Sequence, residues 1–404
     1  MTAIITPPRQ QPPPAITTTG TAEPTVRLHA TAAEFTAAQW DRLVDDDFDL
    51  GLYSSHQWIR ALEMTHGPQP VLAARAGCLT GVLPTWTSRA EDAGGLFEPV
   101  AMTRRLISMP GRHVLWLGTR RSTAATITCA PGPLRRPALT ALLEEARKAA
   151  ADQGLACAVW PYLSGEQALE AAACHPLAQA VLHTADTWLD VPPDGMRGIQ
   201  ATARSKNRRQ WRHEREEFAC HGTVQWTGLT PDTCSRIAAL LAATRDKHGG
   251  SGGTDLMQRV LAAQRAAGLA ERAAVALARR HGEDAVRAAA VFYHHGDSAL
   301  YGRYWGTDGM APPYAYFEMT LYAALDMAAQ RGFRRLHLSV PASPAKLSRG
   351  AQAVPLALVY LPVSPGARLD PKAVQRHNHR SAWPWASTPG SRDRSWARWI
   401  TPGG

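Results

Sequence analysis

The chain has 404 residues, of which 45% are apolar and 19% are charged, and its formal net charge is +10. This composition excludes global disorder, and at roughly 100 to 200 residues per domain the length predicts two packed units rather than one small binding module. No segment approaches the ~18 uninterrupted apolar residues of a membrane helix, and the first residues contain no hydrophobic signal-peptide core. We therefore expect a cytoplasmic protein without membrane insertion.

The cysteines and the distribution of charge further limit which classes of protein the chain can belong to. The six cysteines form neither a Cys-x-x-Cys pair nor a tight cluster, which argues against a zinc ribbon and a disulfide framework. Residues 1–190 hold 15 basic and 18 acidic residues, whereas residues 191–404 hold 29 and 16. Only five of the 44 basic residues are lysines, a bias typical of GC-rich coding, so the location of the charge is more informative than its sum. Most of the excess lies in residues 197–215 and 366–404.

The N-terminal part predicts a flexible arm followed by a first α/β unit. Residues 1–26 are rich in Pro and Thr and lack apolar periodicity, which predicts disorder. We place the first unit at residues 27–190. Thr31 and Glu34 form a capping-box pattern for a first helix, and the pair Ser54-Ser55 can cap a second. The elements expected next are strands at 71–74 and 78–86, a helix at 138–153 and a strand at 155–160.

The second unit, placed at residues 191–364, repeats the same order of elements. A helix at 199–220 and a strand at 224–226 open it. The elements expected after these are helices at 231–247 and 254–268, a hairpin of strands 286–293 and 298–306, a helix at 314–331, and strands at 335–340 and 355–361. Each unit is thus expected to be a mixed sheet flanked by helices. Residues 365–404 form a basic, Trp-rich tail that we expect to be polar and loose.

Three stretches carry a resemblance to a known family. They are WDRL at 40–43 with SHQWIRALE at 55–63, the basic segment SKNRRQWRHER at 205–215, and LYGRYWG at 300–306 followed by YFEMTLY at 316–322. Over residues 35 to 362 the chain resembles Fem-like N-acyltransferases of the GNAT superfamily, the predicted enzymes of peptidoglycan biosynthesis or recognition. The resemblance implies an α/β (α+β) fold of two tandem GNAT-like units. Relatives transfer an amino acid from aminoacyl-tRNA to an amine of a cell-wall precursor or antibiotic intermediate.

The resemblance also implies where the chemistry lies. In such folds the acyl donor enters where two strands splay apart, and the strand at 300–306 is the candidate edge. Alternation along a strand places Tyr301, Arg303 and Trp305 on one face and Tyr304 on the other; ordinary sheet aromatics are the alternative interpretation. The candidate catalytic residues are Lys346, Tyr304 and Glu318, and the candidate substrate-binding residues are Arg303, Trp305, Tyr316 and Ser339.

Lys346 and Glu318 each have a mechanistic and a structural interpretation. A lysine after the strand at 335–340 resembles the family's cation at the developing oxyanion of the donor carbonyl; a solvated loop lysine is the alternative. The chain departs from its relatives here, since Pro344 and Ala345 replace a Glu-His turn and Leu338 replaces a strand glutamate. Glu318 lies in an otherwise apolar turn and needs a partner or a task; an ion pair with Arg303 would satisfy it.

The basic segment predicts a phosphate-binding helix. Arg204, Arg208, Arg212 and Arg215 are spaced by four, four and three residues and therefore share one face of a helix. Trp211 and Phe218 can anchor the opposite face. Such a stripe suits contact with tRNA phosphates, although a solvated arginine face is the commoner outcome. The candidate RNA-binding residues are Arg204, Lys206, Arg208, Arg209, Arg212 and Arg215.

The tail and several short patterns allow other interpretations. The tryptophans of the tail alternate with arginines and could stack on unpaired bases, or they could dock back on the body. The G-x-S-x-G match at 249–253 follows a predicted helix rather than a strand, so we expect a mobile substrate lid and no serine hydrolase. RAAGLA at 265–270 imitates a CoA pyrophosphate cradle but ends a helix. The histidine pairs at 294–295 and 377–379 lack acidic or cysteine partners, so neither metal nor cofactor is expected.

The function expected from these features is formation of an amide bond by direct attack of an acceptor amine on aminoacyl-tRNA. The acceptor would be a small-molecule or peptide amine in natural-product or cell-wall precursor biosynthesis. An acyl-CoA or acyl-carrier donor is one alternative. A non-catalytic RNA- or cell-wall-recognition protein on a degenerate GNAT fold is another.

Overall fold

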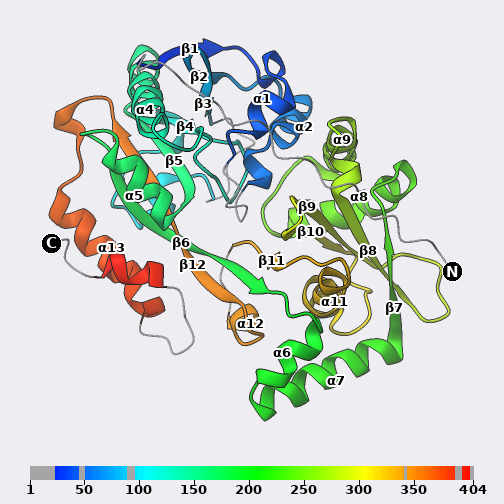
Figure 1. The fold of residues 1–404 in the computed structure, drawn as a ribbon. Helices are drawn as coiled ribbons and strands as arrows, with labels where there is room; N and C mark the ends of the chain where they lie inside the picture. Colours follow the sequence, from blue (N-terminus) through cyan, green and yellow to red (C-terminus); the bar gives the residue numbers. More distant parts are fainter. Residues whose placement is uncertain (1–22, 45–50, 89–95, 341–343, 387–393, 401–404) are drawn as a thin grey trace.

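A computed structural model describes residues 23–44, 51–88, 96–340, 344–386 and 394–400 (Figure 1). Residues 1–22 of the expected arm lie outside this description, but Thr25 and Val26 belong to the first strand, so ordered structure begins slightly earlier than the sequence predicts. The strands form one twelve-stranded sheet in the order β1-β2-β3-β4-β5-β12-β6-β11-β10-β9-β8-β7. Their bounds are β1 Thr25–His29, β2 Val71–Ala76, β3 Cys78–Thr87, β4 Val114–Leu117, β5 Cys157–Ser164, β6 Gln179–Asp190, β7 Gly222–Thr227, β8 Ala273–Arg280, β9 Ala288–His295, β10 Ala299–Thr307, β11 Arg335–His337 and β12 Gln352–Pro362.

Helices cover both faces of this sheet. In the N-terminal half, buried side chains of α4 and α5 pack on one face. In the C-terminal half, α8 and α9 cover one face, while α7 and the α10–α11 segment cover the other. The α-helices are α1 Ala37–Asp41, α2 His56–His66, α3 Pro99–Met102, α4 Arg135–Asp152, α5 Gly165–Ala173, α6 Met196–Thr202, α7 Ser205–His221, α8 Pro231–Lys247, α9 Gly253–Ala266, α10 Ala315–Phe317, α11 Ala323–Gln330, α12 Pro344–Leu347 and α13 Pro371–Ala386.

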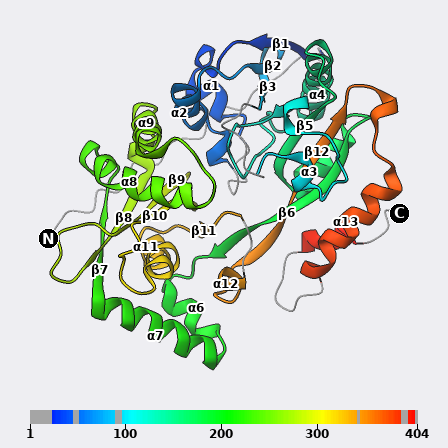
Figure 2. The ribbon, with the colours of Figure 1, turned by 180° about the vertical axis from the view of Figure 1, so that it is seen from behind.

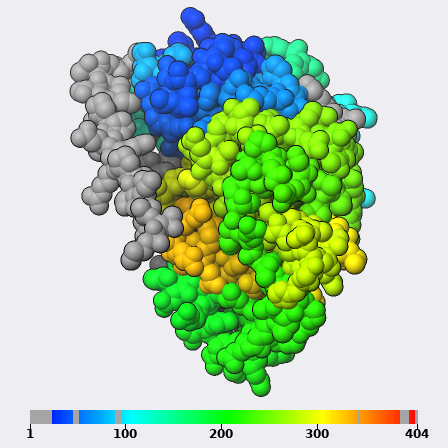
Figure 3. Space-filling view, turned by 90° about the vertical axis from the view of Figure 1, so that its right-hand side faces the viewer, coloured from blue at the N-terminus to red at the C-terminus, as the bar shows by residue number. Residues whose placement is uncertain are grey.

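The two halves exchange their last strands. β6 ends the N-terminal half along the chain, yet its last residues, Trp188 to Asp190, pair with β11 of the C-terminal half. β12 ends the C-terminal half and inserts between β5 and β6, pairing antiparallel with both. The long β6–β12 ribbon crosses between the halves in Figure 1, and Figure 3 shows the N-terminal half seated directly on the C-terminal half. The chain turns from one half to the other near residue 190, while the sheet continues without interruption.

The fold class predicted from the sequence is confirmed: two α/β units repeat one element order, and each contributes a mixed sheet flanked by helices. Among the described strands, one pair in each half is parallel, β4 with β5 and β10 with β11. Among the caps, Ser55 accepts a hydrogen bond from the backbone of Trp58 at the start of α2, as expected.

Two helix predictions are wrong in detail. The capping box lies at Thr36 and Gln39, because Glu34 instead accepts hydrogen bonds from His29 and Ala30. The single helix predicted at 199–220 is divided into α6 and α7, since the backbone at Ala203 and Arg204 is extended.

The C-terminal tail is ordered over the described residues, contrary to the expectation that it is loose. Helix α13 lies against the β6–β12 ribbon (Figure 2), where the Asn378 side chain accepts from the backbone of Leu182 and donates to Ala180 O. Trp396 is 2% exposed, and its indole Nε1 donates to Ala353 O at 2.8 Å. Of the two interpretations of the tail tryptophans, docking on the body therefore holds for Trp396 and Trp399, whereas Trp383 is 55% exposed.

This docking predicts a large loss of stability on truncating Trp396. Replacement by Ala removes a buried aromatic side chain and its hydrogen bond, which lowers the free energy of unfolding by about 3–5 kcal/mol. Trp383→Ala in the same tail is the matched control and should cost much less, because its side chain is mostly in solvent. Denaturant unfolding followed by circular dichroism measures both values. Equal small losses would show that the tail does not contribute to the core.

Candidate active site

A cavity opens in the C-terminal half where β10 and β11 separate. The two strands pair only from Ala299 to Tyr301 with Arg335 to His337, and beyond these residues they diverge. The cavity measures about 360 Å³. It is lined by Thr244, His248, Phe292, Gly302, Arg303, Tyr304, Trp305, Tyr316, Thr320, Leu321, Leu338, Ser339, Val340 and Lys346. Six of the seven predicted catalytic and substrate-binding residues line this one cavity, and Glu318 does not.

A β-bulge sets the geometry of the β10 edge. The register with β9 shifts between Gly302 and Tyr304, which leaves Arg303 as the extra residue. The predicted alternation is therefore wrong beyond Gly302, because a bulge adds one residue and re-aims the side chains after it. Tyr301 and Tyr304 pack with one core cluster, and Trp305 packs with the cluster on the opposite face.

The Tyr304 hydroxyl is held by side chains of the α8–α9 layer. Gln264 is 3% exposed and donates through Nε2 to the Tyr304 hydroxyl at 2.8 Å. The Gln264 amide is itself oriented, because its Oε1 accepts a hydrogen bond from the Tyr293 hydroxyl at 2.6 Å. Since the Tyr304 oxygen accepts from Gln264, its own proton can be donated to a ligand.

Lys346 lies in the short helix α12, within the segment that connects β11 to β12. Its Nζ donates to Leu338 O at 2.7 Å and to Ser339 O at 2.9 Å, and the residue is 7% exposed. Burial lowers the pKa of Lys346 to about 8, and the negative charge of Asp186 opposes this shift. Ser339 has a φ of +60°, and its carbonyl also accepts from the Thr187 hydroxyl at 2.6 Å. The sharp turn after β11 thus aims two carbonyl groups at one ammonium.

A buried ion pair fixes the segment that carries Lys346. The Arg349 guanidinium donates to both carboxylate oxygens of Glu214 at 2.7 Å, to the Tyr322 hydroxyl at 2.7 Å and to Ala345 O at 2.9 Å. Arg349 and Glu214 are 4% and 3% exposed. Neither residue was singled out in the sequence. The pair joins α7 to the backbone beside Lys346, and Asn207 of α7 adds a hydrogen bond to Ser348 O.

Glu318 lies in a π-helical turn, Glu318–Tyr322, between α10 and α11. It forms an ion pair with Arg215 at 3.3 Å, not with Arg303 as the sequence interpretation suggested. Burial raises the pKa of the Glu318 carboxyl, and Arg215 opposes the shift. Arg215 also pairs with Asp326 at 3.0 Å, so this arginine points into the protein instead of continuing the basic stripe.

The other cations of the basic segment lie at the surface. Trp211 and Phe218 are 2% and 4% exposed and anchor α7, as the sequence predicts. Arg208 is half-buried and donates to Ala203 O at 2.6 Å across the α6–α7 break. The exposed cations are Arg204, Lys206, Arg209 and Arg212, and none of them forms an ion pair with a described residue.

At the equivalent strand pair of the N-terminal half, β4 with β5, the described residues close the space that is open between β10 and β11. Beyond the parallel pairing of β4 with β5, Gly118 packs so closely on Trp160 that an added Cβ would lie 2.7 Å from the indole nitrogen. Ala125 then donates to Tyr162 O and forms a parallel bridge with Leu163. The chain after β4 thus returns to β5 and fills the gap that stays open between β10 and β11.

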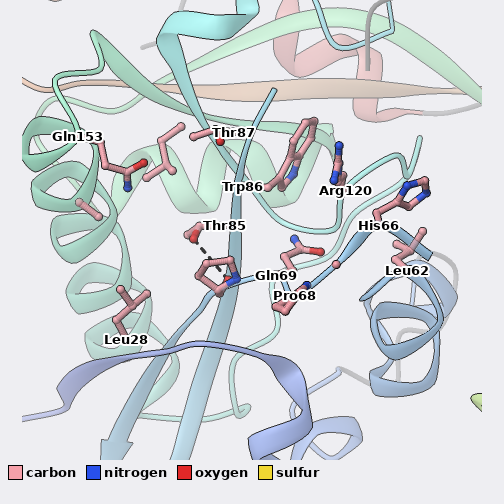
Figure 4. A pocket seen from close by; sticks show the side chains of 14 residues that line it. Leu28, Leu62, His66, Pro68, Gln69, Thr85, Trp86, Thr87, Arg120 and Gln153 are labelled. Atoms are coloured by element: carbon pink, nitrogen blue, oxygen red, sulfur yellow. Dashed lines mark hydrogen bonds between the residues drawn. The ribbon is translucent and has the colours of Figure 1, made fainter. Parts of the chain in front are cut away.

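A second hollow of about 290 Å³ lies elsewhere in the N-terminal half, between α2 and α4 (Figure 4). Trp86 and Gln69 line it, and the Gln69 side chain donates to Gly118 O at 2.9 Å. The Arg120 guanidinium lies 5.8 Å from the Trp86 ring centroid. None of the predicted site residues belongs to this hollow.

One buried polar pair near the cavity was not recognised in the sequence. His337, the last residue of β11, and Asp186 of β6 are both 0% exposed, and His337 Nε2 lies 2.7 Å from Asp186 Oδ2. The pair forms only because the exchanged strand β6 lies beside β11. No periodicity or motif links two residues that are 151 positions apart.

The patterns set aside in the sequence have structural explanations. Residues 249–253 follow α8, and no strand directly precedes them. The segment RAAGLA contains the last residue of α9, Ala266, and Gly268 follows it with a φ of +84°. Over the described ranges, no three His, Cys, Asp or Glu side chains are grouped so that they could hold a metal ion. In the same ranges no helix is long and apolar enough to cross a membrane.

The lowered pKa of Lys346 predicts a distinctive titration. With lysines labelled at the ε position, one of the five NMR signals should titrate with a midpoint near 8. That signal should be absent from Lys346→Met and present in the control Lys372→Met, which alters a lysine of α13. A titration near 8 that survives Lys346→Met would assign the perturbed amine to another lysine.

Comparison with known proteins identifies relatives of the family and of the fold. The model of the FemAB-like family, described as peptidoglycan biosynthesis/recognition, matches residues 123–380. A conserved protein of unknown function from Bacteroides thetaiotaomicron has a TM-score of 0.53 at 13% identity, covering 81% of this chain and 98% of its own. The FemX crystal structure gives 0.50 at 12% identity, covering 80% and 96%. The C-terminal domain of a putative lysylphosphatidylglycerol synthetase from Agrobacterium fabrum gives 0.50 at 10%, covering 82% and 92%. No curated protein sequence matches the chain.

Proposed function

Because the chain belongs to the FemAB-like family, we propose that it is an N-acyltransferase that forms an amide bond in the cavity between β10 and β11. The favoured donor is aminoacyl-tRNA, and the acceptor is an amine of a cell-wall or natural-product intermediate in the cytoplasm. The observation that carries the proposal is Lys346, a buried cation fixed by two carbonyl groups at the wall of this cavity.

The proposed reaction needs no covalent enzyme intermediate. The lone pair of the acceptor amine attacks the ester carbonyl of the donor, and a tetrahedral oxyanion forms. The bond from carbon to the ribose oxygen then breaks, and the proton lost by the amine passes to that oxygen. Lys346 stabilises the oxyanion electrostatically, and the Tyr304 hydroxyl supplies a second donor. Holding amine and ester together supplies a further part of the rate enhancement.

The surface of α7 supports an RNA donor. Its exposed cations, Arg204, Lys206, Arg209 and Arg212, form a surface suited to successive phosphates. The same helix contacts the Lys346 segment through the Glu214–Arg349 ion pair and the Asn207–Ser348 hydrogen bond. A donor whose phosphates rest on α7 would therefore present its acyl end close to Lys346.

The segment after β10 disfavours a CoA donor. A pyrophosphate cradle needs free backbone N–H groups at a helix N-terminus. Here α10 begins at Ala315 directly after Pro312, Pro313 and Tyr314, and proline has no N–H to donate. The Ala315 N–H is also used, since it donates to Pro312 O.

Replacing Lys346 tests the catalytic assignment. Lys346→Met should lower kcat by about 10²–10³-fold while donor affinity changes little, because the charge acts mainly in the transition state. Transfer of labelled amino acids from aminoacyl-tRNA to amines gives kcat, and filter binding gives donor affinity. Comparable losses in both quantities would make Lys346 a binding residue, and unchanged turnover would favour a non-catalytic recognition protein.

The pH dependence follows from the pKa of about 8. The cationic form of Lys346 is the active one, so the charge is present below pH 8 and kcat should fall as the pH rises through 8. Lys346→Arg carries a guanidinium that stays protonated, and its profile should lack this high-pH decline. A decline near pH 8 that persists in the arginine variant would belong to another group.

The salt dependence of tRNA binding tests the α7 surface. The double variant Arg209→Ala, Arg212→Ala removes two exposed cations, and each lost phosphate contact should flatten the slope of log affinity against log salt by about one unit. The matched control, Arg376→Ala with Arg380→Ala, alters two exposed arginines of α13. Superimposable salt series for wild type and the α7 variant would refute phosphate binding by these residues and favour the acyl-CoA or acyl-carrier donor.

A further inference from the structure

The lining of the β10–β11 cavity has one sign of charge. Arg303 and Lys346 contribute two cations and His248 an imidazole, and none of the lining residues is Asp or Glu. Lys346 is engaged by carbonyl groups of the turn after β11. The other cation, Arg303, has no such carbonyl turn around it, and its surroundings determine what it can bind.

Arg303 is surrounded by aromatic rings from both halves. Its guanidinium carbon lies 5.4 Å from the ring centroids of Tyr53 and Trp58, which come from the N-terminal half, and 5.0 Å from that of Tyr304. These faces attract a cation and fix its position, but they accept none of its five N–H protons in a strong hydrogen bond. The rings therefore orient the guanidinium without neutralising it.

The Arg303 guanidinium has one hydrogen bond to a backbone carbonyl, and the hydroxyls of Tyr53 and Tyr304 are its other polar neighbours. One terminal nitrogen donates to Arg121 O at 3.2 Å. The Nε is buried and has no hydrogen-bond partner among the described residues, and no described carboxylate forms an ion pair with this side chain. A cation that is partly removed from water without a carboxylate partner is costly, so a ligand that supplies an oxyanion to the buried Nε would be bound there with a gain.

The charge balance selects the kind of oxyanion. A single guanidinium matches a carboxylate, which carries one negative charge and accepts two parallel N–H bonds. A phosphate monoester carries about −1.5 to −2 charges at neutral pH, which is more than the one guanidinium held among these rings compensates. The aminoacyl end of the proposed donor carries an ammonium and an ester but no carboxylate, so a carboxylate bound at Arg303 must belong to the acceptor.

We propose that Arg303 binds the carboxylate of the acceptor, so that the acceptor carries both an amine and a carboxylate, as an amino acid or short peptide does. This assignment of the acceptor class rests on the proposed transferase function. The carboxylate on Arg303 would orient the amine toward the donor carbonyl beside Lys346. The aromatic walls Trp305 and Tyr316, whose ring centroids lie 5.3 Å apart, would pack against the acceptor side chain.

Matched pairs of probes test the inference. The probes are L-amino acids and their carboxamides, which differ in the carboxylate, and O-phosphoethanolamine, which carries phosphate instead. Binding is measured by calorimetry. For the best-bound pair, wild type should prefer the acid by about tenfold or more, as expected for hydrogen bonds to a charged group. Arg303→Gln should reduce this ratio to about one, and Arg303→Lys should retain part of it.

The controls separate recognition from folding. Arg236→Gln changes an exposed arginine of α8 and should keep the wild-type ratio. Thermal unfolding of each variant reports whether it folds, and the lysine variant remains informative if Arg303→Gln does not. An equal preference for acids in wild type and Arg303→Gln overturns the inference, as does a lack of any preference for acids. Tighter, Arg303-dependent binding of O-phosphoethanolamine overturns the choice of carboxylate.

The inference and the proposed function can fail separately. If amino acids are transferred from aminoacyl-tRNA to carboxamides as fast as to acids, the proposed transferase function holds. The proposed binding of the acceptor carboxylate by Arg303 is then wrong. Arg303-dependent binding of acids without transfer from any aminoacyl-tRNA would keep the anion site and overturn the proposed donor.

Discussion

The exchange of β6 and β12 is the constraint on which the rest of the structure depends. β12 lies between β5 and β6, and β6 pairs with β11, so neither half has a complete sheet without a strand from the other. The exchange places Asp186 of β6 against His337 and Thr187 against Ser339 O. The direction in which the chain leaves β11 is therefore fixed by the opposite half, and that direction opens the cavity.

The two halves differ at their equivalent parallel strand pairs, β4–β5 and β10–β11. In each pair the strands separate after three residues of pairing. In the N-terminal half the chain returns to β5 and packs Gly118 on Trp160, which leaves no room for a ligand. In the C-terminal half a bulge at Arg303 and a turn of positive φ at Ser339 hold the strands apart. Residues of the N-terminal half then complete the site from outside, since Tyr53 and Trp58 enclose Arg303.

The sequence predicts those features that depend on local pattern. Apolar periodicity located α8 and most of α4 and α9. The resemblance to Fem-like N-acyltransferases, and not composition, directed attention to β10 and Lys346, which both line the cavity. Prediction from the sequence failed where a tertiary contact determines the local structure. The bulge at Arg303 is a mismatch between β10 and β9, and no property of β10 alone reveals it. Likewise, the sequence analysis did not predict strands β1, β4, β6 and β8.

The other differences between the sequence predictions and the structure also arise from tertiary contacts. Asp186 and His337 are unremarkable in the sequence and become a buried pair only through strand exchange. Glu318 was correctly expected to need a partner, but the partner is Arg215 of α7, which also pairs with Asp326 of α11. The tail was expected to be loose because it is basic, yet its tryptophans supply the apolar surface that docks it.

The Glu214–Arg349 pair explains how two separate cationic regions belong to one site. A buried ion pair seldom stabilises a fold more than apolar residues of equal volume would, because both charges must be desolvated. The hydrogen-bond geometry of the Glu214–Arg349 pair is nevertheless specific. Arg349 distributes its donors among Glu214 of α7, Tyr322 of the π-helical turn and the carbonyl of Ala345, next to Lys346. The exposed cations of α7 and the buried ammonium of Lys346 are therefore held in fixed positions relative to each other. A ligand long enough to contact both would meet them at a fixed separation.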